Sequence, residues 1–398
     1  MSVSIIILGS NPATKLGLIR SIGEAIECHI TVINMVHQIP KKGSASVDCQ
    51  SKYVSKYLYA LKYQPDALCE TLLTHCKEEG TKPIVLSVDD DSAYMVDVIQ
   101  EKLKPYFICA NINGKAGEIA KLMNKQVQKQ LALEHGFNVT KSWTVDVKDG
   151  KFSVPDDITY PCYVKGLLSY NTLKSFQGKC ESKEALCSAL ESVAQKYSCQ
   201  MIVEEFLDID ADLGLIGFCD GNDCVIPGVV ELLDEGHGPH KGVSAFGLAR
   251  KARQGDDFVE KAASLVSSLH LFGLFNIDLV KSHGKIYFIE LNLRFAAYGY
   301  AVSKAGANLP ECFVRTALKQ DTGSLNREIV NDSYYLNERV ALDDVKGGYR
   351  SLKEYKALRK KADFGLMEND ADLRPFQVYK RQIVIGYVKS KVKRILKL

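Results

Sequence analysis

Short apolar runs alternate with amphipathic stretches over the N-terminal quarter of the chain. Residues 4–8 and 82–88 are continuous runs rich in β-branched side chains, and turn or acidic residues follow each run. Between them, residues 16–26 have helical spacing of their apolar positions, and residues 30–36 have the composition of a second strand. Strands that alternate with helices predict a parallel sheet covered on both faces. We therefore expect an N-terminal α/β domain at residues 1–112 and an α/β fold class.

A different order of elements is predicted after this domain. One helical stretch at 114–136 contains Lys121, Lys125 and Lys129, and strands dominate after Gly136. Turn residues join some of these strands as hairpins. The expected elements are strands at 143–147, 162–165, 201–207, 213–219, 225–232, 275–280 and 286–291, and helices at about 183–196 and 256–271. This part of the chain is therefore predicted to be α+β, with antiparallel strands.

The composition narrows the classes of function. Of the 398 residues, 46% are apolar and 25% are charged, and a net charge of +3 is too small to favour nucleic acid as a partner. The 12 cysteines are scattered without a C-x-x-C pair, which predicts reduced cysteines in small apolar sites rather than a zinc site or a disulfide framework. No apolar run has the length of a signal-peptide core or a membrane span. We expect a cytoplasmic protein.

The last part of the sequence, residues 326–398, is expected to be a C-terminal extension with a basic end. Near that end, Val388, Val392 and Ile395 share one helical face, and lysines and arginines surround them. Such a segment can make a weak contact with an anionic membrane surface. The favoured alternative is a terminal strand and helix that dock on the body of the protein.

The strongest chemical signal lies on the predicted hairpin at 275–291 and just beyond it. Side chains alternate faces along a strand, so Glu290, Asn292 and Arg294 point the same way. Asp278 on the neighbouring strand can join them. Two carboxylates and an amide offer the oxygen ligands that suit Mg²⁺ or Mn²⁺, and carboxylates this close need a cation to neutralise them. The guanidinium of Arg294 is suited to a phosphate or a developing oxyanion.

The run from Asp278 to Arg294 resembles the D…E-x-N-x-R metal and phosphate motif of the ATP-grasp ligases. The resemblance implies an N-terminal α/β domain followed by two subdomains that hold ATP between them. On this basis the ATP-grasp domain is placed at 113–325, with its lid subdomain at about 138–205. The implied cofactors are ATP and Mg²⁺ or Mn²⁺, with Asp278, Glu290 and Asn292 as the metal ligands.

Other elements of that family occur here in the expected order. Met123-Asn124-Lys125 resembles the segment with the first nucleotide-contacting lysine, and Lys165 resembles the lid lysine that contacts the phosphates. The resemblance also implies an adenine-binding hinge at Glu204, Glu205, Phe206 and Leu207. A ribose-binding acid is placed at Asp212, with Asp208 and Asp210 as open alternatives.

The chain departs from the family in the phosphate loop. Many relatives have Lys-Pro where Lys165-Gly166 stands here, and residues 166–179 only loosely resemble a Gly- and Ser-rich loop. Candidates for phosphate contact in this loop are Lys174, Ser175, Gly178 and Lys179. Outside it, the candidates for substrate or phosphate contact are Arg250 and, in the glycine-containing segment 234–242, His237 and His240. A plain solvent-exposed loop is the alternative for that segment.

Two further segments, 6–21 and 298–310, are similar to the D-aspartate ligase-like carboxylate–amine ligases. The resemblance implies that a carboxylate attacks the γ-phosphate of ATP and that an amine then attacks the acyl-phosphate. In this scheme Lys125 and Lys165 offset phosphate charge, and Arg294 stabilises the oxyanion. A kinase and a nucleotide-binding protein without catalysis are the alternatives. The expected partners are a small carboxylate and an amine, and a homodimer is left open.

Overall fold

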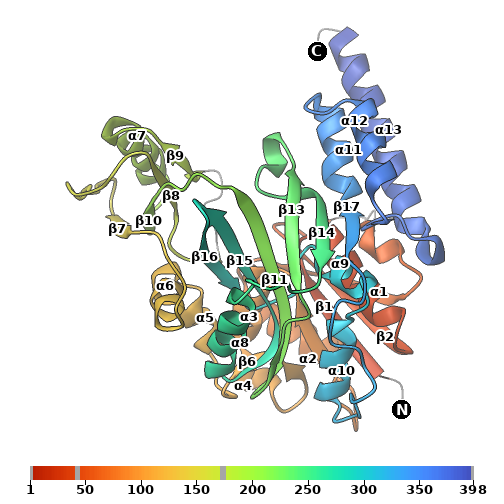
Figure 1. The fold of residues 1–398 in the computed structure, drawn as a ribbon. Coiled ribbons are helices and arrows are strands. Elements are labelled where there is room, and N and C mark those ends of the chain that lie inside the picture. Colours follow the sequence, from red (N-terminus) through yellow and green to blue (C-terminus); the bar gives the residue numbers. More distant parts are fainter. Residues whose placement is uncertain (1–2, 41–44, 171–175, 396–398) are drawn as a thin grey trace.

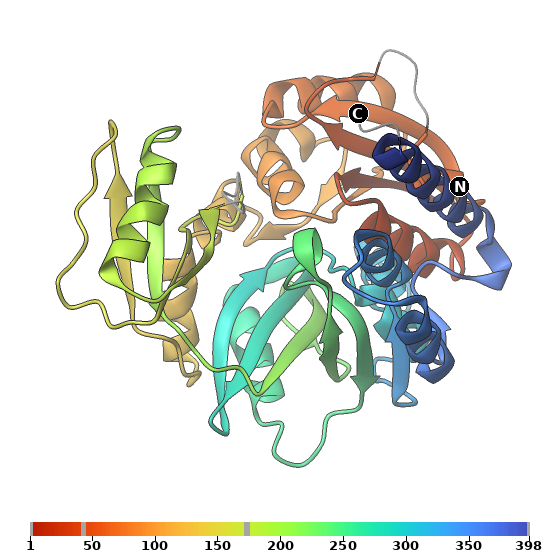
Figure 2. The same ribbon diagram turned by 90° about the horizontal axis from the view of Figure 1, so that it is seen from above.

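The computed structural model describes residues 3–40, 45–170 and 176–395, which form three sheets with helices around them (Figures 1 and 2). The predicted α/β fold class is confirmed, because a parallel sheet comes first in the chain and antiparallel sheets follow. Two of the candidates for phosphate contact, Lys174 and Ser175, lie outside the described residues.

The first sheet has five parallel strands in the order β3-β2-β1-β4-β5. Its central strand is a continuous apolar run because helices cover both faces, and Ile5 to Leu8 are at most 2% exposed. The first helix begins at Pro12, earlier than predicted, because the side chain of Asn11 caps it. The elements are β1 (Val3–Gly9), α1 (Pro12–Gly23), β2 (Cys28–Val36), β3 (Val54–Leu61), α2 (Pro65–His75), β4 (Ile84–Ser87), α3 (Asp90–Val98), α4 (Gln100–Leu103) and β5 (Ile108–Cys109).

The single helix predicted at 114–136 is two helices, α5 (Glu118–Leu122) and α6 (Lys125–Glu134). The side chain of Asn124 accepts hydrogen bonds from the first turn of α6 and so starts a new helix. Lys121 therefore lies on a different helix from Lys125 and Lys129, whereas the periodicity of the sequence had placed all three on one helix.

The second sheet is antiparallel, with the order β7-β10-β8-β9, and forms a separate lobe (Figure 2). One helix covers one of its faces, where Leu186, Leu190 and Val193 pack into the core of the lobe. The elements are β7 (Ser142–Val147), β8 (Cys162–Gly166), β9 (Gly178–Cys180), α7 (Lys183–Ala194) and β10 (Cys199–Glu205).

The third sheet is the largest and joins segments that are far apart in the chain. Its main order is β16-β15-β11-β13-β14-β17-β18, while β12 pairs with β11 and β6 pairs with β15. Two of these strands come from the predicted C-terminal extension, which is thus built into the body. The elements are β6 (Asn111–Ile112), β11 (Ala211–Asp220), β12 (Cys224–Val225), β13 (Val229–Glu235), β14 (Ser244–Arg250), α8 (Phe258–Ser268), β15 (Leu271–Ser282), β16 (Lys285–Asn292), β17 (Ser333–Leu336) and β18 (Phe364–Gly365).

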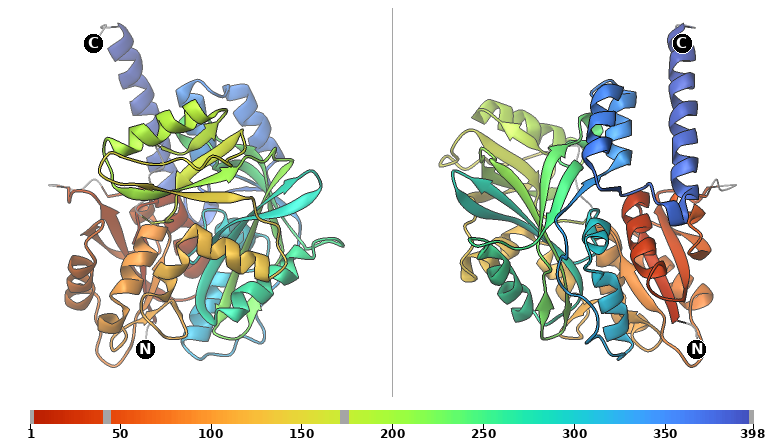
Figure 3. Two further views of the ribbon diagram at one scale, coloured as in Figure 1. Left: turned by 90° about the vertical axis from the view of Figure 1, so that its left-hand side faces the viewer. Right: turned by 45° about the vertical axis from the view of Figure 1, so that its right-hand side comes forward.

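The remaining elements are helices α9 (Gly299–Lys304), α10 (Leu309–Ala317), α11 (Glu338–Gly347), α12 (Leu352–Lys361) and α13 (Arg374–Ile395). The predicted terminal strand is wrong, since residues 381–385 belong to α13. The second half of this helix stands away from the body in two views (Figure 3). Across the described ranges, none of the helices combines the length and the apolar composition that crossing a bilayer requires.

Candidate active site

The β15–β16 hairpin brings the predicted metal ligands together. Asp278 lies opposite Glu290 in the ladder, and Asn276 lies opposite Asn292. Directly opposed residues of an antiparallel pair share one face, so these four side chains form a single polar surface. Asn276 was not among the predicted site residues, although its position two residues before Asp278 puts it on the same face.

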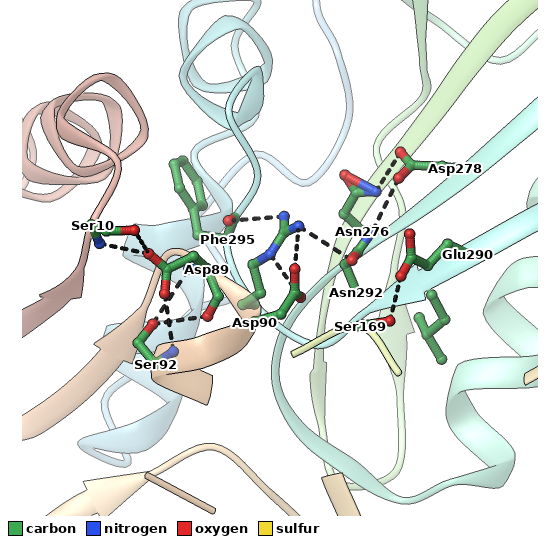
Figure 4. Close-up of polar contacts among 12 residues, drawn as sticks. Ser10, Asp89, Asp90, Ser92, Ser169, Asn276, Asp278, Glu290, Asn292 and Phe295 are labelled. Atoms are coloured by element: carbon green, nitrogen blue, oxygen red, sulfur yellow. Dashed lines mark hydrogen bonds and ion pairs between the residues drawn. The ribbon is translucent and has the colours of Figure 1, made fainter. Parts of the chain in front are cut away.

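Asp278 is held by three neutral donors, and Figure 4 shows two of them, Asn276 and Asn292. Its Oδ1 accepts hydrogen bonds from Asn276 Nδ2 at 2.8 Å and Tyr298 Oη at 2.9 Å, and its Oδ2 accepts from Asn292 Nδ2 at 3.0 Å. Burial, and then the nearby charge of Glu290, raise the pKa of Asp278 to about 6. The carboxylate is thus fixed in orientation but has no cation of its own in these contacts.

Tyr298 reaches Asp278 because the strand beneath it carries a glycine. Gly214 on β11 pairs with Asp278, and a Cβ at this glycine would lie 2.2 Å from Tyr298 Oη. Any larger residue would push the tyrosine away from the carboxylate. Asp212, the predicted ribose-binding acid, lies two residues from Gly214 on the same strand and is half-buried. Burial, and then Glu235, raise the pKa of Asp212.

Glu290 contacts a lysine and a serine from outside the hairpin. The Nζ of Lys125 lies 3.3 Å from Glu290 Oε1 and 3.2 Å from Ser169 Oγ, and the serine hydroxyl donates to the same carboxylate oxygen. Burial alone would raise the pKa of Glu290, but Lys125 and Lys165 outweigh burial and lower it to about 2. The lysine at the start of α6 and the predicted metal ligand are therefore neighbours. Ser169 was missed, since the loop after β8 has no periodicity that could place it.

A second charged cluster joins α6 to the four-stranded sheet. Lys165 Nζ lies 2.6 Å from one oxygen of Glu204, and Lys129 Nζ lies 2.6 Å from the other and 2.7 Å from Thr140 Oγ1. Burial would raise the pKa of Glu204, but Lys165 and Lys129 together lower it. Lys129 was not among the predicted site residues, although it lies one turn after Lys125 on the same helix. This cluster holds one carboxylate and two cations.

The predicted hinge is the segment that leads from β10 of the second sheet to β11 of the third. Glu205 ends β10 and is exposed, and Leu207 is half-buried. The backbone N–H of Phe206 donates to Pro161 O at 3.3 Å, and Lys179 Nζ lies 4.4 Å from the centre of the Phe206 ring. Lys179 and Gly178, two of the phosphate-loop candidates, thus begin β9 close to the hinge.

Arg294 is bound by an acidic residue from the first sheet. Its Nε and Nη2 lie 3.2 Å from the two oxygens of Asp90, and Nη2 also donates to Asn292 Oδ1 at 3.2 Å. Burial would lower the pKa of Arg294, but Asp90 raises it above its ordinary value. Asp90 follows β4 at the carboxyl edge of the parallel sheet, next to β1, where the strand order reverses and ligands bind in such sheets. The sequence indicates only that Asp90 is one of the acidic residues that follow the run at 82–88.

The other candidates are placed elsewhere. Arg250 forms ion pairs with Glu231 and Asp256. The segment that was expected to be a loop is fastened to α11 through His237 Nδ1, 3.0 Å from Asp344, and through His240 Nε2, 3.1 Å from Asp343. The roles proposed for these three candidates therefore gain no support from their contacts.

The donor set on the hairpin fits Mg²⁺ chemically. Asp278 and Glu290 face each other across the ladder, and each raises the free energy of ionising the other. Two carboxylates and an amide are oxygen ligands of the kind Mg²⁺ binds, usually with waters and phosphates in addition. No group of three or more His, Cys, Asp or Glu side chains within the described ranges could hold a metal ion by itself.

Comparisons with known proteins identify solved structures with a similar fold. No protein-family model matches the sequence. An N5-carboxyaminoimidazole synthetase from Staphylococcus aureus, solved with ADP, superposes with a TM-score of 0.65 at 14% identity, covering 90% of this chain and 87% of that one. The fold is that of the ATP-grasp enzymes. An L-amino acid ligase from Bacillus licheniformis has a similar structure, with a TM-score of 0.59, 12% identity and coverage of 84% and 79%.

One curated relative matches most of this chain. The C-terminal section of the carbamoyl phosphate synthase large chain of Aquifex aeolicus is 23% identical over 345 residues, which are 84% of this chain and 60% of that protein. The chain therefore spans less than two-thirds of this relative. The resemblance to D-aspartate ligase-like enzymes gains no separate support from these comparisons.

Proposed function

We propose that this protein is an ATP- and Mg²⁺-dependent ligase that activates a carboxylate as an acyl-phosphate and couples it to an amine. The carboxylate is proposed to be that of an amino acid, as in the D-aspartate ligase-like branch, and the products are ADP, phosphate and an amide. The proposal rests on one observation, which is that a surface rich in lysines lies against a surface rich in carboxylates. Lys125 from α6 contacts the carboxylate–amide surface on β15 and β16, and the charge of Lys165 from β8 also acts on Glu290 of that surface.

The lysines are suited to nucleotide phosphates. Lys125 and Lys165 both lie within the electrostatic reach of Glu290, and Lys165 and Lys129 share a single carboxylate. Phosphate oxygens would compete for these cations, because charge-assisted hydrogen bonds to phosphate are strong. Adenine would lie at the hinge formed by Glu204, Glu205, Phe206 and Leu207, with ribose toward Asp212.

The carboxylate–amide surface supplies the other half of the site. Asp278, Glu290 and Asn292 would hold Mg²⁺, which supplies positive charge against the phosphates when it is bound. The side chains that hold these ligands in place are Asn276, Tyr298 and Ser169. Such supporting hydrogen bonds fix the orientation of metal ligands and tune their affinity.

The proposed reaction has two steps. An oxygen of the substrate carboxylate attacks the γ-phosphorus of ATP, and the bond from this phosphorus to the ADP oxygen breaks. The amine nitrogen then attacks the acyl carbon, loses a proton and expels phosphate. Arg294, held by Asp90, is placed to stabilise the negative charge that develops on oxygen in either step. Water must be excluded during the acyl-phosphate's lifetime, which is a role for the four-stranded lobe.

The proposal is tested by measuring ADP and phosphate release from Mg-ATP with a panel of amino acids, each with and without amine acceptors. We expect one acid and one amine to drive release together and to yield an amide. A phosphorylated product that accumulates without an amine would replace the ligase with the kinase alternative. No release with any pair, together with tight ATP binding, would favour the non-catalytic alternative.

A further inference from the structure

Helix α13 has two parts that differ in their surroundings. Its first turns pack on the body, where Phe376 is 3% exposed and Tyr379 is 7% exposed, and Tyr379 Oη donates to Arg339 O at 3.1 Å. Ile383 is half-buried and packs against the same cluster, which includes Leu16. These three positions are spaced as one face of a helix. The helix is thus anchored by one face over its first half.

The opposite face of the helix is uncovered. Val384 is 60% exposed, the largest value among the large apolar side chains of the described residues, and Ile385 is 54% exposed. In the sequence, apolar residues continue at helical spacing after these two, at Val388, Val392 and Ile395, and the five together define an apolar stripe. The described members of the stripe, Val384 and Ile385, therefore lie away from the face that docks on the body. In Figure 3 the second half of α13 projects beyond the other elements, so the body does not return to cover it.

The flanks of this stripe are strongly basic. From Arg374 to Leu398 the sequence has 8 lysines and arginines and no aspartate or glutamate. Four of the basic residues, Lys389, Lys391, Lys393 and Arg394, belong to the projecting half of the helix. A second copy of this helix would bring like charges together, which opposes pairing. Charge complementarity favours an anionic surface that also accepts apolar side chains.

We propose that the projecting half of α13 is a peripheral membrane-binding element that lies on bilayers containing anionic lipids. Its apolar stripe would enter the boundary between head groups and acyl chains, and its lysines would contact the lipid charges. The helix remains on the surface of the bilayer. The proposal does not depend on the ligase reaction, because the anchor and the stripe are separate from the hairpin cluster.

The test is sedimentation of the full-length protein with vesicles. One set of vesicles is phosphatidylcholine alone, and the other contains about 30 mol% phosphatidylserine. We expect binding to the anionic vesicles only, and a loss of binding as salt rises from about 0.1 to 0.5 M. The triple variant Lys389→Glu, Lys391→Glu and Lys393→Glu should bind at least about tenfold more weakly, because each basic residue contributes to the attraction. The double variant Val384→Ser and Ile385→Ser should also bind more weakly, by a smaller factor.

A matched control carries the same change of charge on α12. Lys356, Lys360 and Lys361 are exposed there, and replacing all three by glutamate should leave vesicle binding at more than half of the wild-type level. Equal binding to both kinds of vesicle, or equal loss in the α12 control, would overturn the proposal. So would a wild-type dimer that the Val384 and Ile385 substitutions convert to a monomer, since a second copy would then be what covers the stripe. ADP release by the same variants in the absence of vesicles is expected to match the wild type.

Discussion

Two buried groups of charged side chains in this protein differ in how their charges are paired. At Arg20, on α1, every charge has fixed partners: Nε donates to Asp372 Oδ2 at 3.0 Å, and the remaining nitrogens donate to the carbonyls of Leu366, Met367 and Asp372. The side chains of Arg20 and Asp372 are at most 1% exposed. One cation and one anion thus satisfy each other, and they join α1 to the segment before α13.

The candidate active site is not balanced in this way. Glu204 has two lysines, whereas the described residues that donate to Asp278 are all neutral. Lys125 and Glu290 connect the cation-rich side to the anion-rich side. A matched pair contributes to specific folding, while unmatched charges of both signs in one place favour ligands that complete them. The two groups therefore separate residues that hold the fold from residues that are proposed to hold a substrate.

The largest expected effect is on turnover. Glu290→Gln removes the charge that Lys125 contacts and one proposed metal ligand, so we expect ADP release to fall by about 10³-fold or more. The free energy of unfolding should change by less than about 1 kcal/mol, since repulsion with Asp278 is relieved as the lysine contact weakens. Coupled-enzyme assays and thermal melts measure the two quantities. A variant that unfolds but whose folded fraction keeps normal turnover would reverse the assignment.

Arg20→Met should show the opposite behaviour. It leaves the carboxylate of Asp372 buried without its cation, which is expected to cost about 3–5 kcal/mol of stability. Turnover per folded molecule should be unchanged at low temperature. Chemical denaturation measures the loss, and the double variant Arg20→Met and Asp372→Asn should recover part of it. If the single variant melts like the wild type, the ion pair between Arg20 and Asp372 does not stabilise the fold.

The two lysines on Glu204 should differ from each other. Lys165 is more exposed than Lys129, at 12% against 5% for the side chain, and is proposed to contact phosphate directly. Lys165→Met is expected to lower kcat/KM by about 10²-fold. Lys129→Met should lower it by about tenfold, through loss of the orientation of Glu204. Equal effects would mean that both lysines act on the same group.

Tyr298→Phe should have the smallest effect. It removes one donor to Asp278 and leaves the ring in place, so the Mg²⁺ concentration for half-maximal activity is expected to rise about tenfold. Stability should fall by about 1 kcal/mol, because Asn276 loses the same hydroxyl. Titration of activity with Mg²⁺ at saturating ATP measures the shift. An unchanged Mg²⁺ requirement would remove Tyr298 from the support of the site.

The sequence predicted those parts of the site that depend on local order. Strand alternation placed Asp278, Glu290 and Asn292 on one face, because the period of a strand is fixed by the backbone. It could not predict that Lys129 pairs with Glu204, which is 75 residues away, or that Arg294 pairs with Asp90, 204 residues away. Such pairs depend on how sheets pack, and no local periodicity records that.

The same distinction holds for the fold. Three strands of the parallel sheet, β1, β2 and β4, were predicted from their apolar runs, whereas β3, β5 and the break between α5 and α6 were missed. Helical spacing continues across that break, and only the capping side chain of Asn124 reveals it. Likewise, the apolar spacing of β17 and β18 does not indicate that they extend the sheet beside β14.

Calorimetric titration with a non-hydrolysable ATP analogue, with and without Mg²⁺, tests the central claim most directly. The account predicts that Mg²⁺ tightens binding to the wild type by at least about tenfold, and that Glu290→Gln still binds the analogue but loses this enhancement. The lysine side of the site would then bind phosphate and the hairpin side would bind metal. Binding that is equally tight with and without Mg²⁺ in the wild type, or no binding at all, would contradict it.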